Sequence, residues 1–238
     1  MKAMPAFSEG SGNPGDGEAG VCIQWPTAAV LPMQPPHHKG TPVLRLGVMA
    51  SGEGSNFEAL VAACRCGELA AEVSLLVVNE PGCGAIDRAE RLGIPHRLLD
   101  HRLRSSREQL DCELVEAFRA AAVDLVVMAG WMRIVTPVLI DAFPQRLINI
   151  HPSLLPSFRG RDGIADALKA GVTLAGCTAH LVVPEVDAGP ILVQAAVPVL
   201  AGDDRCSLHE RIRRQEHRIL PLAVRLAAEL LSRAGDQG

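Results

Sequence analysis

The stretch VLRLGVMASGEGSNFEALVAAC, residues 43–64, decides the fold. Residues 43–50 form a short, mostly apolar run, which is typical of a buried strand. Residues 55–69 carry apolar side chains at helical spacing, and a glycine loop separates the two segments. A strand, a glycine loop and a helix in this order are the first unit of an α/β fold.

The same alternation continues along the chain. Further strands are predicted over residues 73–78, 95–99, 123–129 and 147–151, and helices over residues 85–92, 105–121, 137–143 and 163–170. Because these strands lack polar alternation, we expect a doubly wound, mainly parallel sheet with helices on both faces. Two longer strands, residues 175–183 and 190–199, fit antiparallel positions at the edge of the sheet. A final helix, capped by Asp203 or Asp204, is expected to be interrupted or bent at Pro221.

Residues 1–42 do not share this pattern. They are rich in Gly and Pro and have no sustained apolar period, so burial would not repay the entropy lost on ordering. We therefore expect a disordered leader over 1–42 and one catalytic domain over 43–238. The adjacent His37 and His38 are interpreted as solvated side chains and not as metal ligands.

Composition narrows the class of protein. The chain has 238 residues and a formal net charge of −4, which gives no general attraction to nucleic acid or to an anionic membrane. No apolar run reaches the roughly 18 residues of a membrane span, and no secretion signal is present. The odd set of seven cysteines has no common metal or redox spacing. We expect a cytoplasmic protein, monomer or homodimer, with reduced thiols, small-molecule substrates and no metal.

The first candidate site is the loop Ser51-Gly-Glu-Gly-Ser-Asn56. Its glycines permit close backbone approach, and free amides at the start of the following helix favour an anion such as phosphate. The loop is neither a Walker motif nor a complete Gly-x-Gly-x-x-Gly, because Phe57 occupies the third glycine position. A tight turn with a Ser cap is the alternative, and the position at the carboxyl end of a strand favours binding.

The second candidate site lies in Ile148-Asn-Ile-His-Pro-Ser153. The period of two places Asn149 and His151 on one face of a strand. Asn149 can donate to an oxygen that becomes negative, and a protonated His151 can stabilise that oxyanion. Asp187, on a surface-facing loop, can favour the protonated histidine and orient its ring. Each residue alone is more often structural. Without a nucleophile motif, direct transfer between two bound substrates is the simplest chemistry.

Six motifs occur in order along the chain: SGEGSN (51–56), AGWMRI (129–134), NIHPSLLP (149–156), CTAH (177–180), DAG (187–189) and QEH (215–217). Together they resemble the phosphoribosylglycinamide formyltransferase family over about residues 43–232. The resemblance implies transfer of the formyl group of 10-formyltetrahydrofolate to the amine of glycinamide ribonucleotide, a step of de novo purine synthesis. It implies no covalent enzyme intermediate and no metal.

The resemblance also implies roles for single residues. The catalytic residues are Asn149, His151 and Asp187, with His180 nearby. The ribonucleotide-binding residues are Gly54, Ser55, Asn56, Arg213 and Glu216. The folate-binding residues are Arg107, Met132, Arg133, Ile134, Val135 and Asn149, together with the segment 182–187. Core packing is the alternative for Met132 and Ile134.

The chain departs from the family in the loop Phe158-Arg-Gly-Arg-Asp-Gly-Ile-Ala-Asp166, where many relatives carry one or two histidines and Ile164 occupies one such place. Three other functions are alternatives. A 10-formyltetrahydrofolate deformylase would need an N-terminal regulatory domain, for which a 42-residue leader is too short. Methionyl-tRNA formyltransferase would need a C-terminal tRNA-binding domain. A catalytically silent module that binds a nucleotide or folate is the third alternative.

Overall fold

The computed structural model describes residues 43–235, so the leader expected over 1–42 lies outside the described residues. The described residues form a seven-stranded sheet in the order β3-β2-β1-β4-β5-β6-β7. Its first five strands in sequence are parallel: β1 (Leu44–Ala50), β2 (Ala71–Val78), β3 (His96–Leu98), β4 (Leu125–Met128) and β5 (Leu147–His151). Two antiparallel strands, β6 (Leu174–Leu181) and β7 (Ile191–Pro198), complete it. The predicted topology is confirmed.

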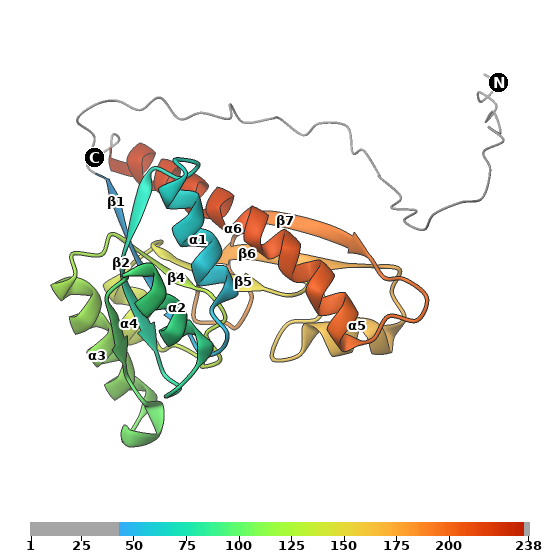
Figure 1. Ribbon diagram of the computed structural model, residues 1–238, viewed down its shortest axis with the longest axis horizontal. Helices are drawn as coiled ribbons and strands as arrows, with labels where there is room; N and C mark the ends of the chain where they lie inside the picture. The colour runs from blue at the N-terminus through green and yellow to red at the C-terminus, as the bar shows by residue number, and fades with distance from the viewer. Residues whose placement is uncertain (1–42, 236–238) are drawn as a thin grey trace. The chain divides into compact units, whose positions relative to one another are not determined.

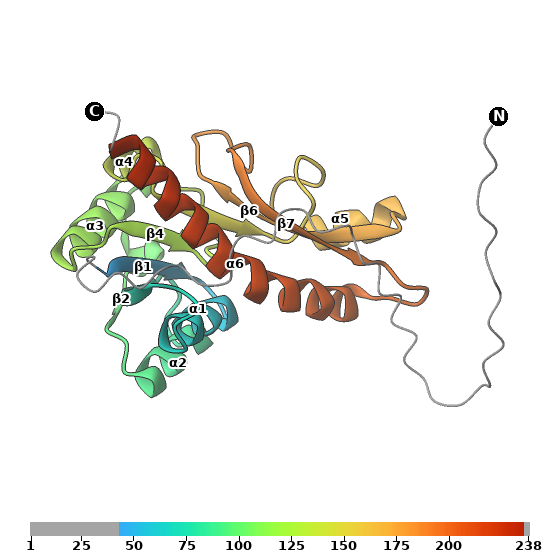
Figure 2. The ribbon, with the colours of Figure 1, turned by 90° about the horizontal axis from the view of Figure 1, so that it is seen from above.

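Helices cover both faces of the sheet, as Figures 1 and 2 show. On one face, a hydrophobic cluster joins the sheet to four helices: α1 (Ser55–Arg65), α2 (Gly84–Leu92), α5 (Gly163–Ala170) and α6 (Arg205–Gly235). The other face is covered by α3 (Arg107–Ala120) and α4 (Pro137–Ala142). In β4, Leu125 and Val127 face the first cluster and Val126 and Met128 the second. Burial on both sides explains why the strands show no polar alternation.

Several helix ends differ from the prediction for physical reasons. α1 ends at Arg65 and not at residue 69, because Gly67 takes a left-handed backbone with φ of 80°. α3 begins at Arg107, where the Ser106 hydroxyl accepts a hydrogen bond from the Gln109 amide at 3.2 Å. Residues 101–103 form a short 3-10 helix that the sequence did not indicate.

The last helix is capped by Asp204, whose carboxylate accepts from the Ser207 amide at 2.8 Å. The predicted interruption at Pro221 is wrong, because α6 continues through this residue. Leu220, Ala223 and Val224 are fully buried, and their packing offsets the cost of a proline inside a helix, ~3 kcal/mol for the lost hydrogen bond and the steric clash together. Figure 2 shows that α6 changes direction near its middle, so the predicted bend is present.

The topology gathers several loops at one edge of the sheet. The strand order reverses between β1 and β4, and the loops that follow the parallel strands β1, β4 and β5 leave from their carboxyl ends. Open α/β sheets bind ligands at this kind of switch point. The loops at this edge are therefore where a site is expected.

The close contact between β6 and β7 predicts that Gly176 cannot be replaced without loss of stability. A Cβ at Gly176 would lie 2.1 Å from the carbonyl oxygen of Ala195, a backbone atom that cannot move without separating the strands. Gly176→Ala should lower the free energy of unfolding by about 1–3 kcal/mol or more, measured by urea denaturation. Gly52→Ala is the control, because a Cβ there meets nothing within 4 Å. Equal stability of the two variants would contradict this reading of the strand contact.

Candidate active site

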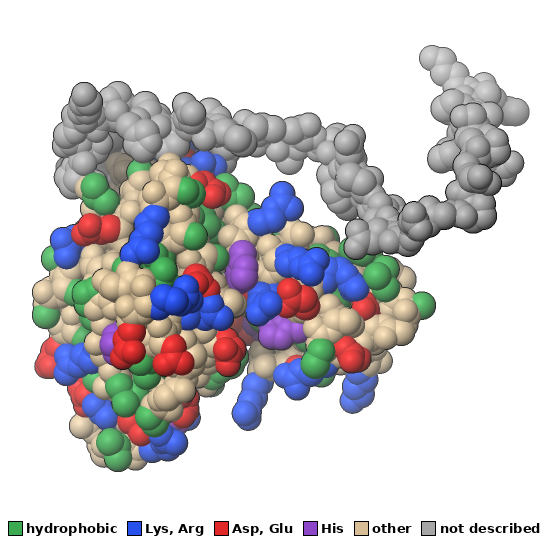
Figure 3. Space-filling model, in the orientation of Figure 1, with side chains coloured by type: hydrophobic (Ala, Val, Ile, Leu, Met, Phe, Trp, Pro, Cys, Tyr) green, Lys and Arg blue, Asp and Glu red, His purple; other side chains and the backbone are tan. Residues whose placement is uncertain are grey.

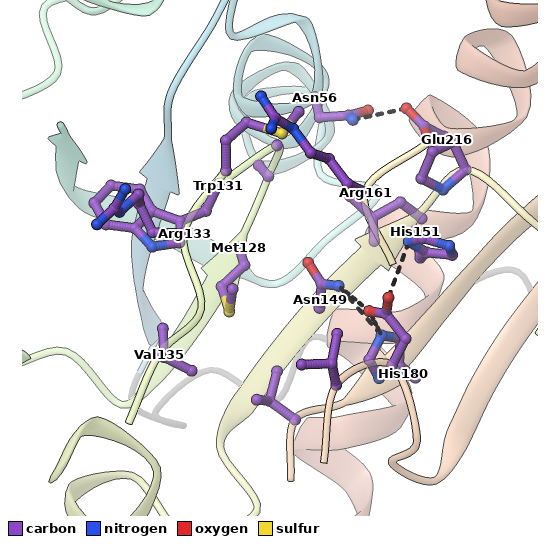
Figure 4. Close-up of a pocket in the computed structure, with 18 of the residues that line it drawn as sticks. Asn56, Met128, Trp131, Arg133, Val135, Asn149, His151, Arg161, His180 and Glu216 are labelled. Atoms are coloured by element: carbon purple, nitrogen blue, oxygen red, sulfur yellow. Dashed lines mark hydrogen bonds and ion pairs between the residues drawn. The ribbon is translucent and has the colours of Figure 1, made fainter. Parts of the chain in front are cut away.

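A cavity of about 620 Å³ lies at the edge of the sheet where the strand order reverses. Its walls come from the loop before α1, the end of β4, the end of β5, the segment 182–187 and the N-terminal half of α6. Figure 4 shows polar side chains from these elements pointing into one space. The two candidate sites of the sequence are therefore parts of the same cavity.

Asp187 lies beside Asn149 and His151 of β5 although it comes from a separate loop. Figure 4 labels the two β5 residues. The Asn149 amide nitrogen is 3.4 Å from one Asp187 oxygen, and His151 Nδ1 is 3.5 Å from the other. Asn149 is half-buried and His151 is buried at the end of β5. This cluster presents an amide, an imidazole and a carboxylate to the cavity.

His180 joins the same cluster from β6, where it pairs directly with Asn149 across the antiparallel register. Its Nδ1 lies 2.8 Å from the carbonyl of Leu181, and a carbonyl only accepts, so this nitrogen carries a hydrogen. When the ring is neutral, Nε2 accepts from the Asn149 amide at 3.2 Å, and both amide hydrogens of Asn149 then face protein acceptors, of which Asp187 at 3.4 Å is the more distant. When the ring is protonated, Nε2 donates toward Asp187 at 3.6 Å.

The Asp187 side chain is only 8% exposed, so the expectation of a surface-facing group is wrong. The loop folds its carboxylate inward, with φ of 51° at Asp187, a left-handed backbone that Asp tolerates better than most residues. Its oxygen accepts a hydrogen bond from the Gly160 amide at 2.9 Å. Burial raises the pKa of Asp187, but the bonds from His180 and Gly160 and the nearby His151 outweigh it, so the pKa is lowered. The carboxylate is ionised at neutral pH.

His151 also binds the loop that follows it. Its Nε2 lies 2.9 Å from the carbonyl of Phe158, so this nitrogen donates while Nδ1 faces Asp187. A Cβ at Gly163 would lie 3.0 Å from the same carbonyl and 3.3 Å from Nε2. The segment from Phe158 to Gly163 therefore packs closely on the imidazole. To donate to a ligand, Nε2 must exchange the Phe158 carbonyl for the ligand oxygen.

The glycine loop does not use a Ser cap. The residue before α1 is Gly54, in a left-handed backbone with φ of 74°, and no side chain caps the helix. A Cβ at Gly54 would lie 2.7 Å from Cβ of Ala85, so both the backbone and the space require glycine. The first amides of α1, at Ser55 and Asn56, are left for an anion in the cavity.

A hydrogen bond between Asn56 and Glu216 joins two parts of the cavity wall that are far apart in the sequence. The Asn56 amide donates to the Glu216 carboxylate at 2.9 Å, between α1 and α6, and both side chains are buried. Burial raises the pKa of Glu216, while the hydrogen bond from Asn56 opposes this shift. Among the described residues, Asn56 Oδ1 is buried without a hydrogen-bond partner. Arg213, one turn earlier on α6, forms an ion pair with Glu210 and also lines the cavity.

The predicted folate-binding residues divide into two groups. Met132 is 73% exposed and Ile134 is 53% exposed, so core packing, the alternative for both, is wrong. They line the cavity together with Arg133, Val135 and the segment 182–187. Arg107, the first residue of α3, is not among the cavity-lining residues.

The sequence analysis assigned no role to two basic residues of the cavity, Arg161 and His209. Arg161 lies in the loop before α5, and no periodic pattern marks a loop residue. His209 lies four residues before Arg213 on α6, and this helical spacing was a usable signal. Figure 3 shows Lys, Arg and His side chains gathered over the half of α6 that contains both His209 and Arg213.

The fold and the cavity define a doubly wound α/β enzyme with its site at the switch point of the sheet. The Formyl transferase family model matches residues 44–224. The chain therefore belongs to the formyl transferase family, which confirms the resemblance seen in the sequence. None of the helices in residues 43–235 is both long and apolar enough to cross a membrane.

Relatives of this chain carry names from purine synthesis. Phosphoribosylglycinamide formyltransferase of Escherichia coli (strain K12) is 38% identical over 181 residues, which are 76% of this chain and 85% of that protein. Glycinamide ribonucleotide transformylase 1 from Symbiobacterium toebii has a crystal structure that matches with a TM-score of 0.77 and 44% identity, covering 79% of this chain and 88% of that one. The human trifunctional purine biosynthetic protein adenosine-3 is 39% identical over 82% of this chain, which spans only 19% of that protein.

The buried Glu216 predicts a gain in stability on neutralisation. Glu216→Gln should unfold at a higher temperature than the wild type at pH 7, because Gln removes the cost of burying a charge and can still accept from Asn56. This cost is fully present at a pH above the raised pKa of Glu216 in the folded protein. It vanishes at a pH below the pKa of a glutamate in the unfolded chain, about 4.3. The difference in Tm should therefore shrink as the pH falls toward 4.

Calorimetry at several pH values measures this difference. Glu116→Gln is the control, because Glu116 is exposed on α3 and its neutralisation should leave Tm nearly unchanged. A Glu216→Gln variant that unfolds at a lower temperature at pH 7 would show that the ionised carboxylate stabilises the fold, contrary to the prediction.

Proposed function

We propose that this chain transfers the formyl group of 10-formyltetrahydrofolate to the amine of glycinamide ribonucleotide in de novo purine synthesis. The observation that carries the proposal is a single cavity with one polar end and one apolar end, and with Asn149, His151 and Asp187 between them. One end presents the free amides of α1, and the other presents exposed apolar side chains. The names of the relatives in Escherichia coli and Symbiobacterium toebii support the same reaction.

The anion-binding end fits the ribonucleotide. The amides of Ser55 and Asn56 at the start of α1 suit a phosphate, and Arg213 adds a positive charge. Glu216 and the unpartnered Asn56 Oδ1 are acceptors, so they suit the hydroxyls of a ribose or the amine of glycinamide and not the phosphate. The ribonucleotide thus extends from α1 toward the amide, imidazole and carboxylate cluster.

The apolar end fits the folate. Met132, Ile134 and Val135 offer apolar contact area to a flat ring system, and the segment 182–187 forms the opposite wall. Arg133 lines this part of the cavity and suits a carboxylate of the glutamate tail. In this arrangement Arg107 can reach only a tail that extends beyond the cavity.

The proposed chemistry is direct transfer. The substrate amine attacks the formyl carbon, and the bond between this carbon and N10 of the folate breaks. The oxygen that becomes negative is stabilised by the Asn149 amide, which exchanges its longer contact with Asp187 for this oxygen. It is also stabilised by His151, protonated beside the ionised Asp187, whose Nε2 exchanges the Phe158 carbonyl for the same oxygen. The amine loses one proton and N10 gains one, so the reaction needs no net proton. Most of the acceleration comes from holding two substrates together and from stabilising the developing charge.

A two-substrate assay tests the proposal directly. Tetrahydrofolate should form from 10-formyltetrahydrofolate only when glycinamide ribonucleotide is present, and the rate should not change with a metal chelator. Release of formate without the amine would instead indicate a deformylase. No turnover with both substrates would indicate a binding module. Action in the cytoplasm, and the choice between monomer and homodimer, remain predictions that cell fractionation and sedimentation can test.

Asp187 gives the sharpest test of the catalytic cluster. Asp187→Asn should lower kcat by about 100- to 10,000-fold, because it removes the charge that favours a protonated His151. The fold should persist, since Asn tolerates the left-handed backbone at this position. Asp187→Ala should be equally slow but less stable. Asp166→Asn, on the exposed side of α5, is the matched control and should keep full turnover. Near-normal turnover of Asp187→Asn would exclude the role proposed for Asp187.

A further inference from the structure

Arg161 lines the cavity, but its guanidinium has no ion pair or hydrogen bond among residues 43–233. The charged residues on either side of it in the sequence do have partners. Arg159 forms an ion pair with Glu185 at 3.0 Å, and Asp162 caps α5 and lies 3.2 Å from Arg205. Because Arg161 lines the cavity and its side chain makes no bond within the described part of the chain, its guanidinium is free to bind an anionic group of a ligand there.

The backbone around Arg161 is held by the catalytic cluster. Gly160 donates its amide hydrogen to Asp187 at 2.9 Å, and the Phe158 carbonyl accepts from His151 at 2.9 Å. On the other side, Asp162 accepts from the Ala165 amide at 3.3 Å at the start of α5. The position of Arg161 therefore depends on contacts made by His151 and Asp187.

The side chain of Arg161 extends toward the anion-binding end of the cavity. Figure 4 shows it running from the neighbourhood of His151 toward Asn56, which is the second residue of α1. Arg213 and His209 line the same cavity from α6. The free amides of α1, the guanidinium of Arg161 and these two side chains thus surround one end of the cavity.

Without Arg161, the formal side-chain charges of Arg213, Glu53 and Glu216 at this end give no net attraction for a phosphate monoester. Such a phosphate carries nearly two negative charges at pH 7, and a helix N-terminus offers the equivalent of only about half a positive charge. Arg213 is partly neutralised by its ion pair with Glu210. The carboxylates of Glu53 and Glu216 also line the cavity and repel an anion. Arg161 adds a guanidinium that is unpaired among the described residues at this end of the cavity, and its planar fork suits two phosphate oxygens.

We propose that Arg161 is a ribonucleotide-binding residue that holds the phosphate together with the first amides of α1 and with Arg213. The proposal rests on the proposed function, because it takes the ligand at this end to be a sugar phosphate. Binding of the phosphate to Arg161 also fixes Gly160, which donates to Asp187. Arg161 therefore links occupation of the phosphate end to the position of the catalytic carboxylate.

Binding of ribose 5-phosphate tests the proposal without any need for turnover. Calorimetry should show that Arg161→Gln binds ribose 5-phosphate roughly 10- to 100-fold more weakly than the wild type, the usual loss for a charge-assisted hydrogen bond. Arg161→Lys keeps the positive charge but loses the planar guanidinium, so its affinity should lie between those of the wild type and Arg161→Gln. Arg159→Gln is the matched control on the same loop, because its partner is Glu185, and it should bind within about twofold of the wild type.

Equal affinities of Arg161→Gln and Arg159→Gln for ribose 5-phosphate would overturn the proposal. So would a wild type that does not bind ribose 5-phosphate at millimolar concentrations. In kinetics, Arg161→Gln should raise KM for glycinamide ribonucleotide by a similar factor and leave KM for 10-formyltetrahydrofolate unchanged. A rise in the folate KM alone would assign Arg161 to the folate carboxylates and would also overturn it. Absence of formyl transfer by the wild type would remove the proposed function but leave the binding test of Arg161 intact.

Discussion

The arrangement of the site depends on one buried carboxylate. Asp187 is held away from water, where an ionised group is stable only if several donors surround it. These donors come from three parts of the chain: Asn149 and His151 on β5, His180 on β6 and the backbone of Gly160. The requirement to compensate one charge thus fixes how two strands and two loops meet. Removal of a donor would leave the charge uncompensated and would release the segment that supplied it.

The sheet supplies the second constraint. The antiparallel register of β5 and β6 sets His180 directly opposite Asn149, and the parallel order of β1, β4 and β5 sets the glycine loop beside them. The bound molecules therefore approach from two sides of a fixed cluster. Gly54 and Gly189 mark places where the backbone must come close, since a Cβ at Gly189 would lie 1.8 Å from the Leu181 carbonyl. These glycines keep the walls of the cavity in place without side chains of their own.

The sequence predicted well whatever depends on regular periods. Apolar runs and helical spacing defined the strands and helices, and the period of two placed Asn149 and His151 on one strand face. Non-local packing determines what the periods could not. The burial of the Asp187 side chain, which the sequence did not predict, depends on loop partners. The sequence left open whether α6 is interrupted or bent at Pro221 and whether Met132 lines a cavity or the core, and packing decides both. Arg161 was missed because its loop has no periodic pattern, and only its neighbours in space identify it.

The hydrogen bond between Asn56 and Glu216 joins residues 160 positions apart in the sequence. Because most of the described elements lie between α1 and α6 in the sequence, the two walls of the anion-binding end cannot meet until these elements have left the ribosome. Contacts of such long range form late and slowly, since a large loop must close before they are made. A nascent chain that has folded only its parallel strands would therefore carry the glycine loop without a complete site. The site would therefore become able to bind ligands in one step with the docking of α6.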